Sequence, residues 1–163
     1  VPLSSWILMS RFEELIAAAN PRLAEISHGR YELRRSDTDA TRSRKNGLGL
    51  SILDHESEEE RNPSTLSGGE TFYVSLALAL GLADVVMAES GGITLSSMFI
   101  DEGFGSLDLD TLDIVMSQLL ALRESDRCIG VISHVDEMAR QIPDQIEVRW
   151  REGEGSTLSI RAS

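Results

Sequence analysis

The amino-acid sequence predicts an α/β fold with a parallel sheet. Two apolar runs, at 94–101 and 127–133, each end in polar residues, which is typical of buried parallel strands. An amphipathic helix pattern at 108–124 separates them, and a longer apolar helix pattern precedes them at 67–89. Because a helix that connects two strands of one sheet forms a right-handed crossover, this order favours parallel pairing. The apolar middle of the segment 67–89 further predicts that this helix is buried.

The N-terminal segment predicts two consecutive helices. Apolar side chains recur at helical spacing through residues 5–19, on one face. Pro21 disfavours the α conformation at Asn20, so we expect the first helix to end there. A shorter helix through Leu23 and Ile26 is expected to close at Gly29.

The next segments predict a pair of strands. Residues 30–35 ("RYELRR") and 47–54 ("GLGLSILD") alternate apolar with polar side chains, which is typical of half-buried strands. The polar segment 36–46 then makes a long hairpin of them. We expect the segment 58–65 ("EEERNPST") to be a loop that leads into the long apolar helix.

The C-terminal segments predict a short helix and a terminal hairpin. The sequence "DEMARQI" ends before Pro143 and is expected to form the helix. The segments "QIEVRWRE" and "STLSIRA" alternate apolar and polar residues on either side of "GEG", and therefore predict two antiparallel strands.

Composition and cysteine content restrict the class of protein. Hydrophobic residues make up 41% and charged residues 26% of the 163 residues, which is ordinary globular composition. Asp84 interrupts the longest apolar stretch, so we expect no membrane span, and the first residues lack the features of a signal peptide. Val1 in place of Met indicates a piece of a longer protein. Cys128 lies in an apolar run and is expected to be a core residue in a reducing compartment.

Charge is unevenly distributed along the chain, whose formal net charge is −12. Six of the fifteen basic residues fall in one short stretch, and the acidic run "DHESEEE" follows at 54–60. Two solvated loops of opposite sign explain this pattern; the alternative is a local phosphate-contact patch, with DNA as the candidate ligand of Arg30, Arg34 and Arg35. The basic stretch consists of Arg30, Arg34, Arg35, Arg42, Arg44 and Lys45.

Polar residues follow both predicted parallel strands, at the edge where ligands of open α/β sheets bind. Asp101 and Glu102 follow the first strand, and His134 follows the second. Each alone has an ordinary structural explanation, such as a polar strand end. Together they form a chemical set, since one carboxylate can hold Mg²⁺ beside nucleotide phosphates, the other can deprotonate a water, and the histidine can donate to a terminal phosphate.

The long helix begins with Ser67, Gly68 and Gly69, which present unpaired backbone N–H groups and the positive end of the helix dipole. Glycines let a phosphate approach this backbone closely, although such a sequence is also found in ordinary turns. The start of this helix is therefore a candidate phosphate site.

Four motifs, found in order in three segments, carry a family resemblance. "LSGGE" (66–70), "MFIDEGFGSLD" (98–108) and "VISHVDEM" (131–138) resemble the signature motif, the Walker B strand with its D-loop, and the switch histidine of an ABC-type ATPase head. Glu70 after the glycines, together with "EGFGSLD", looks most like the bacterial SbcC family, the SMC-like ATPases of the SbcC–SbcD double-strand-break nuclease.

The resemblance implies ATP and Mg²⁺ as cofactors and a role for each motif residue. Asp101 would coordinate Mg²⁺, Glu102 would activate the attacking water, and His134 would sense the γ-phosphate. The signature residues would contact ATP held by the opposite protomer, and the D-loop would link the two sites. These residues are Ser67, Gly68, Gly69 and Glu70 in the signature motif, and Ser106, Leu107 and Asp108 in the D-loop.

The same resemblance implies a half-domain organisation: a coiled-coil end and short helix at 1–28, a strand hairpin and loop at 29–62, and the motif-bearing lobe at 63–163. The phosphate-binding pattern G-x-x-x-x-G-K-[ST] does not occur in these 163 residues, whose single lysine is Lys45. The implied partners are an N-terminal Walker A lobe of the same protein, a second head protomer, an SbcD-type nuclease and double-stranded DNA, with no membrane. We expect a cytoplasmic, nucleoid-associated protein whose C-terminal lobe alone is inactive and exposes apolar surface.

Three alternatives remain open. A chromosome-structuring SMC head shares the motif order but usually differs around the D-loop. An ABC transporter nucleotide-binding domain is disfavoured by "LSGGE", by "GFGSLD" and by the coiled-coil end at 5–19. A degenerate interaction module is disfavoured by the intact acid pair and histidine.

Overall fold

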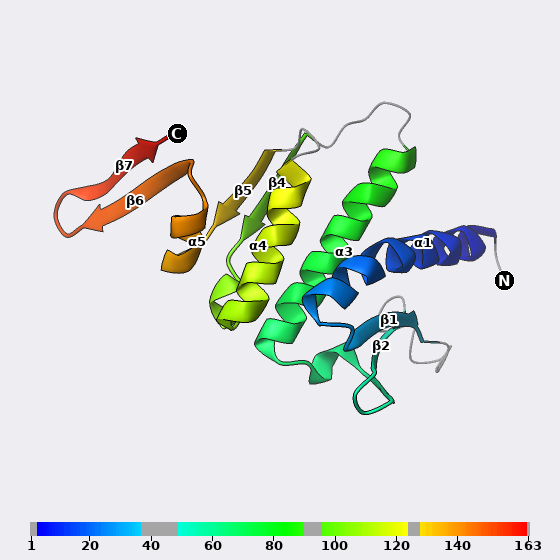
Figure 1. Cartoon of the computed structure of the whole chain (residues 1–163). Coiled ribbons are helices and arrows are strands. Elements are labelled where there is room, and N and C mark those ends of the chain that lie inside the picture. The colour runs from blue at the N-terminus through cyan, green and yellow to red at the C-terminus, as the bar shows by residue number, and fades with distance from the viewer. Residues whose placement is uncertain (1–2, 37–48, 90–95, 124–127, 163) are drawn as a thin grey trace.

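Two long helices, α1 (Leu3–Ile26) and α3 (Gly68–Glu89), pack against each other, and the described residues also form three small sheets (Figure 1). The computed structural model describes residues 3–36, 49–89, 96–123 and 128–162. The antiparallel sheet beside α1 has the order β1–β2–β3 and consists of β1 (Tyr31–Arg35), β2 (Leu50–Asp54) and β3 (Glu59–Arg61).

The second half of the chain follows the predicted α/β order. β4 (Ser97–Asp101) leads through the short 3₁₀ helix η2 (Phe104–Ser106) into α4 (Leu109–Arg123), and then to β5 (Cys128–Ile132). β4 and β5 pair in parallel, which confirms the predicted pairing. After α5 (Asp136–Gln141), the strands β6 (Gln145–Arg151) and β7 (Gly155–Arg161) form the terminal hairpin, which lies at the end of the molecule remote from α1 (Figure 1).

α1 is one continuous helix, so the predicted break at Asn20 before Pro21 is wrong. A proline inside a helix costs about 3 kcal/mol, because it removes a hydrogen bond and crowds the preceding turn. Beyond Pro21 the helix buries Leu23 and Ile26 almost completely, which contributes roughly 1.5–3 kcal/mol for each. The side-chain amide of Asn20 also bonds the carbonyl and the N–H of Leu33, at 3.0 and 2.8 Å. Tertiary packing therefore carries the helix through the proline.

α3 approaches α1 at very short range. A Cβ atom on Gly81 would lie 2.9 Å from the backbone nitrogen of Ala19, so this crossing requires glycine. Arg22 and Asp84 form an ion pair of 2.6 Å between the two helices. The buried face of α3 consists of Tyr73, Val74, Leu76, Ala77, Leu80 and Ala83.

The prediction that α3 is buried holds for one face only. Leu82 is 51% exposed, and Ala79 is exposed as well. By length and composition alone, the segment Gly68–Ala88 could cross a membrane, with a mean hydropathy of 1.8. Core helices of globular proteins pass the same test, so this is weak evidence for a membrane span.

The strand pair at β1 and β2 is confirmed, with Tyr31 opposite Asp54 and Arg35 opposite Leu50. The expected loop at 58–65 is wrong in part, because Glu59–Arg61 pairs with β2 as the strand β3. This strand is short and strongly charged, so its side chains give no apolar alternation. Its pairing comes from the exposed edge of β2.

The parallel pair β4–β5 is covered on one face only. Met98 and Ile100 of β4 pack against the core, whereas Phe99 is 74% exposed and Ile132 of β5 is 55% exposed. Cys128 is exposed too, so its predicted place in the core is wrong. The outer face of this pair has no covering element among the described residues, and the expected burial of both strands is therefore only half realised.

The terminal hairpin carries an apolar face that is open to solvent. Val148 is opposite Leu158 and Ile146 is opposite Ile160, so these side chains share one face with Trp150. All of them are 63–77% exposed. Contiguous apolar surface of this kind marks an interaction site, and we call these five residues the hairpin face.

We expect Gly81→Ala to lower the free energy of unfolding by about 1–3 kcal/mol, because the added methyl group forces α3 away from α1. In a helix without this contact, the same substitution stabilises by roughly 1 kcal/mol, so the sign of the change tests the contact. Urea denaturation followed by circular dichroism measures it. Ser75→Ala, on the exposed side of α3, serves as the control and should not destabilise. Equal or greater stability of Gly81→Ala would contradict the close crossing.

Candidate functional site

The chain turns sharply at the carboxyl end of β4. Asp101 is the last residue of the strand and is exposed, and the next two residues adopt left-handed backbone angles: φ is 57° at Glu102 and 98° at Gly103. The Glu102 N–H donates to the carbonyl of Ile132 at 2.9 Å, which continues the pairing with β5. A Cβ atom on Gly103 would collide with the ring of Phe72, so glycine is required at this turn.

The turn brings Glu102 to His134, 32 residues later in the chain. The Glu102 Oε2 lies 3.0 Å from the His134 Nδ1, and the two side chains are 53% and 78% exposed. The sequence predicted both residues at strand ends, and the structure places them in direct contact. When the Nδ1 carries the proton directed at Glu102, the Nε2 donates to a ligand only if the imidazole is charged. With the Nδ1 directed at Glu102, the Nε2 is the ring nitrogen that can face a ligand.

The 3₁₀ helix η2 connects two parts of the site. A Cβ atom on Gly105 would lie 3.5 Å from the His134 Nε2, so the backbone of η2 passes close to the imidazole. The next residue, Ser106, lies against the start of α3, because a Cβ atom on Gly69 would be 2.7 Å from the Ser106 carbonyl oxygen. The Ser106 hydroxyl donates to the carbonyl of Gly103 at 2.6 Å, which fixes η2 on the preceding turn.

The remaining predicted D-loop residues lead into α4. Leu107 packs on the core, and Asp108 caps the helix by accepting hydrogen bonds from the backbone N–H and the hydroxyl of Thr111, at 2.9 and 2.8 Å. These hydrogen bonds lower the pKa of Asp108, so its carboxylate stays charged at the positive end of the helix. The local role of Asp108 is thus to begin α4 at a fixed place beside η2.

α3 begins with a reciprocal capping box. The Ser67 N–H donates to the Glu70 Oε2 at 2.7 Å, and the Glu70 N–H donates to the Ser67 Oγ at 3.2 Å. The N–H groups of Gly68 and Gly69 belong to the first turn, which has no intrahelical acceptor for them. The start of α3 therefore presents backbone donors at a point that the capping box fixes.

The Glu70 carboxylate is engaged on both oxygens, because its Oε1 accepts from the hydroxyl of Tyr31 at 2.7 Å. Burial raises the pKa of Glu70, but the hydrogen bonds from Ser67 and Tyr31 outweigh it and lower the pKa on balance. Burial and the bond to Glu70 raise the pKa of Tyr31 to about 12, so this hydroxyl remains a proton donor. The sequence grouped Glu70 with the nucleotide contacts; in the structure its carboxylate contacts protein donors.

Sequence reasoning missed Asp54 and Arg61, which are connected to this carboxylate through the Tyr31 hydroxyl. Asp54 is 2% exposed and bonds the guanidinium groups of Arg30 and Arg61, at 3.0 and 3.3 Å. The hydrogen bond from Arg30 is the main cause that lowers the pKa of Asp54 to about 2. Its place in the acidic run 54–60 indicated a solvated residue. The signal that identifies it is its position two residues after Ile52, on the buried face of β2.

The arginines proposed to contact DNA are all ion-paired in the described structure. Arg30 bonds Asp54 and Glu56, Arg34 bonds Glu32 at 3.0 Å, and Arg35 bonds Glu13 at 2.7 Å. The other three cations of the basic stretch, at 42, 44 and 45, lie outside the described residues. DNA contact by these arginines requires them to exchange carboxylate partners for phosphates, and it stays a prediction.

The donor set at the end of β4 fits a magnesium ion held by one protein carboxylate. Asp101 is exposed at the strand end, and Mg²⁺ typically keeps several waters beside one or two carboxylates and substrate phosphates. Among the described residues, no three or more His, Cys, Asp or Glu side chains form a group that could hold a metal ion. The ion would depend on nucleotide phosphates for its remaining ligands.

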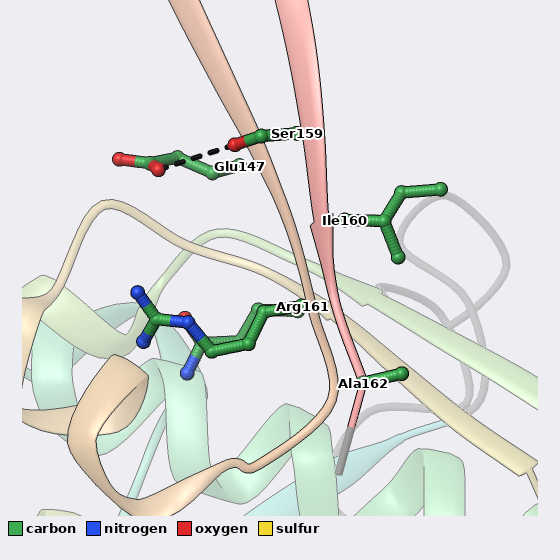
Figure 2. Close-up of a pocket in the computed structure, with 6 residues that line it drawn as sticks. Glu147, Ser159, Ile160, Arg161 and Ala162 are labelled. Carbon is green, nitrogen blue, oxygen red and sulfur yellow. Dashed lines mark hydrogen bonds between the residues drawn. The ribbon is translucent and has the colours of Figure 1, made fainter.

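A hollow of about 440 Å³ lies beside the terminal hairpin and contains none of the predicted site residues. Figure 2 shows Glu147, Ser159 and Arg161 along it, and the Ser159 hydroxyl donates to the Glu147 Oε2 at 3.4 Å. Its lining is mostly polar side chains of β6 and β7. It is therefore separate from the Glu102–His134 pair and from the start of α3.

Comparison with solved structures defines the class of this fold. The chain superposes on a crystal structure of the "SmcHead bound to the C-winged helix domain of ScpA" with a TM-score of 0.70, 19% identity, and coverage of 97% of this chain and 45% of that one. A structure from work on "ATP-driven dimerization and DNA stimulated activation of SMC ATPases" gives a TM-score of 0.69 at 18% identity, over 96% and 88% of the two chains. The fold is that of an SMC ATPase head, which is an ABC-type lobe.

Sequence comparison identifies the family. Residues 30–121 match the family model described as "SbcC/RAD50-like, Walker B motif", and the chain belongs to this family. It is 47% identical over 155 residues to the SbcC subunit of nuclease SbcCD from Staphylococcus epidermidis RP62A, and 45% identical to the protein of the same name from Staphylococcus aureus NCTC 8325. Each alignment covers 95% of this chain but 15% of the relative, so the chain corresponds to a small part of those proteins.

We expect Asp54→Asn to destabilise the fold by about 1–3 kcal/mol at pH 7, because two arginines lose their charged acceptor. The pKa of Asp54 is lowered from 3.8 to about 2, so its stabilising effect is complete above pH 3.8 and is lost as the pH falls towards 2. Between pH 4 and 2, the stability of the variant should therefore fall less than that of the unmodified chain. Thermal unfolding across this range measures both effects.

Glu152→Gln, in the turn of the terminal hairpin, is the matched control that removes one exposed carboxylate. It should leave the acid profile unchanged. A profile of Asp54→Asn parallel to that of the unmodified chain would show that Asp54 is not held in its charged form by the two arginines.

Proposed function

We propose that this chain is the C-terminal half of a DNA-repair ATPase head, which binds and hydrolyses ATP at a head-dimer interface and thereby regulates an associated double-strand-break nuclease of the SbcD type. The observation that carries the proposal is the 3.0 Å contact between Glu102 and His134 at the carboxyl edge of a parallel strand pair. Membership of the SbcC/RAD50-like family and the relatives named as parts of a nuclease support it. The SMC-type alternative rests on similarity of 18–19% identity, which reports the fold alone.

Each site residue has a proposed role in the complete head. Asp101 would hold Mg²⁺, which supplies charge neutralisation on the phosphates, and Glu102 accepts the proton of the attacking water. His134, oriented by Glu102, donates from the Nε2 to the terminal phosphate when its imidazole is charged. The backbone of Ser67, Gly68 and Gly69 contacts the phosphate of a nucleotide on the opposite protomer.

The G-x-x-x-x-G-K-[ST] pattern does not occur in the 163 residues, and we propose that another segment of the protein supplies the phosphate loop. We propose that this segment is an N-terminal lobe that packs on the open apolar surfaces described above. Asp101 and Phe99 lie on the same uncovered face of β4, since alternate residues of a strand share a face. A lobe that covers Phe99 therefore also approaches the proposed magnesium ligand.

The same proposal includes double-stranded DNA as a ligand of the complete head and a cytoplasmic, nucleoid-associated location. Relatives named as parts of a nuclease support the nucleic-acid ligand, and the DNA contact through Arg30, Arg34 and Arg35 depends on release of their present ion pairs.

In the complete head, Glu102→Gln should lower the kcat of ATP hydrolysis by roughly 10²–10⁴-fold, because the amide cannot accept the proton of the attacking water. The ATP-bound head dimer should persist longer for the same reason. Steady-state phosphate release and analytical size exclusion with ATP and Mg²⁺ measure the two effects. Glu25→Gln, on the exposed side of α1, is the control. Undiminished turnover in the Glu102 variant, or turnover by this chain without the N-terminal lobe, would contradict the assignment.

Val148→Asp should weaken binding of the N-terminal lobe by roughly tenfold or more, because it puts a charge into the centre of the hairpin face. Thr157→Asp adds the same charge on the opposite face of the hairpin and should bind normally. Co-purification of the two lobes, followed by calorimetry, measures the affinity. Equal binding by both variants would exclude the hairpin face as the docking surface.

A further inference from the structure

One side chain connects the antiparallel sheet to the start of α3. The Tyr31 hydroxyl donates to the Glu70 Oε1 at 2.7 Å and accepts from the Arg61 guanidinium at 3.3 Å. Tyr31 belongs to β1, Arg61 to β3 and Glu70 to the first turn of α3. The hydroxyl is thus the point at which the sheet and the capping box of α3 meet.

Tyr31 is held rigidly in this position. It is 2% exposed, its N–H donates to the Ser27 Oγ at 3.1 Å, and its ring stacks with Tyr73 of α3 at a centroid distance of 6.3 Å. The Arg30 guanidinium also lies over the Tyr31 ring, 4.9 Å from its centroid. Because these contacts fix the ring, they also fix the direction of the hydroxyl toward the Glu70 carboxylate.

Arg61 extends the same network to the segment just before α3. Its guanidinium donates to the Thr65 carbonyl oxygen at 2.9 Å, as well as to Asp54 at 3.3 Å. Asp54 is buried and also bonds Arg30. The buried carboxylate therefore fixes Arg61, and Arg61 fixes both the Tyr31 hydroxyl and the chain that enters the capping box.

We propose that Tyr31 is a positioning residue for nucleotide binding in trans, which keeps the Glu70 carboxylate in the capping box and away from the backbone donors of Gly68 and Gly69. This inference rests on the proposed function, in which those donors contact a phosphate. Without the hydroxyl, the Glu70 Oε1 loses its partner at the positive end of α3, where free N–H groups attract any anion. The carboxylate then competes with the phosphate for the same donors.

The test uses the complete head with ATP and Mg²⁺. Tyr31→Phe removes the hydroxyl and keeps the ring, and we expect the KM for ATP and the ATP concentration for half-maximal dimerisation to rise roughly tenfold, with kcat changed by less than about twofold. Tyr73→Phe is the matched control, because no hydrogen bond of its hydroxyl is found among the described residues and its ring belongs to the same stack. This control should leave KM unchanged, and both variants should unfold at similar temperatures.

A double-mutant cycle identifies the route of the effect. If Tyr31 acts through Glu70, then Tyr31→Phe adds little to the KM change in the background of Glu70→Ala. Fully additive effects, an unchanged KM in Tyr31→Phe, or a drop in thermal stability and kcat with KM unchanged would each overturn the positioning role. An unmodified head that neither dimerises with ATP nor hydrolyses it would instead overturn the proposed function, and the role of Tyr31 with it.

Discussion

The crossing of α1 and α3 at Gly81 and Ala19 is the constraint on which the rest of the structure depends. Because no side chain separates the two backbones there, α3 has a single position relative to α1 and to the sheet that follows α1. That position places Tyr73 of α3 on Tyr31 of the sheet. It also places the first turn of α3 against η2, where Gly69 permits a second close backbone approach. Helix packing in the core thus sets the location of the proposed phosphate-facing turn.

The positive charge available to an anion at the start of α3 comes from backbone groups. The chain has a net charge of −12. Arg30 and Arg61, which lie near the start of α3, form ion pairs with Asp54. A phosphate at Gly68 and Gly69 would meet N–H groups and a helix dipole, which together amount to about half a positive charge. Such a site is too weak to hold a triphosphate alone, so in the proposed head the strong cationic contacts come from the lobe with the phosphate loop. This division explains why a strongly acidic chain can serve a nucleotide site.

Local patterns in the sequence predict the helices and strands whose formation depends on the periodicity of their own side chains. Apolar periodicity identifies α3, α4 and the parallel pair, and motif order places Glu102 and His134 at neighbouring strand ends. The predictions that failed concern features that tertiary contacts decide. Pro21 lies inside α1 because Leu23 and Ile26 are buried beyond it. Strand β3 forms because an edge was open to it, and Cys128 is exposed because nothing among the described residues covers its face. The hydrogen bond between Tyr31 and Glu70 joins residues 39 positions apart, and no sequence spacing predicts it.

The chemistry of the Glu102–His134 pair depends on burial that the described residues do not supply. Both side chains are more than half exposed, so water screens any interaction between them. A lobe that covers Phe99 would approach the end of β4 and exclude water from the pair as it buries the apolar face. In the proposed head, assembly with the second lobe and removal of water from the Glu102–His134 pair would therefore be one event.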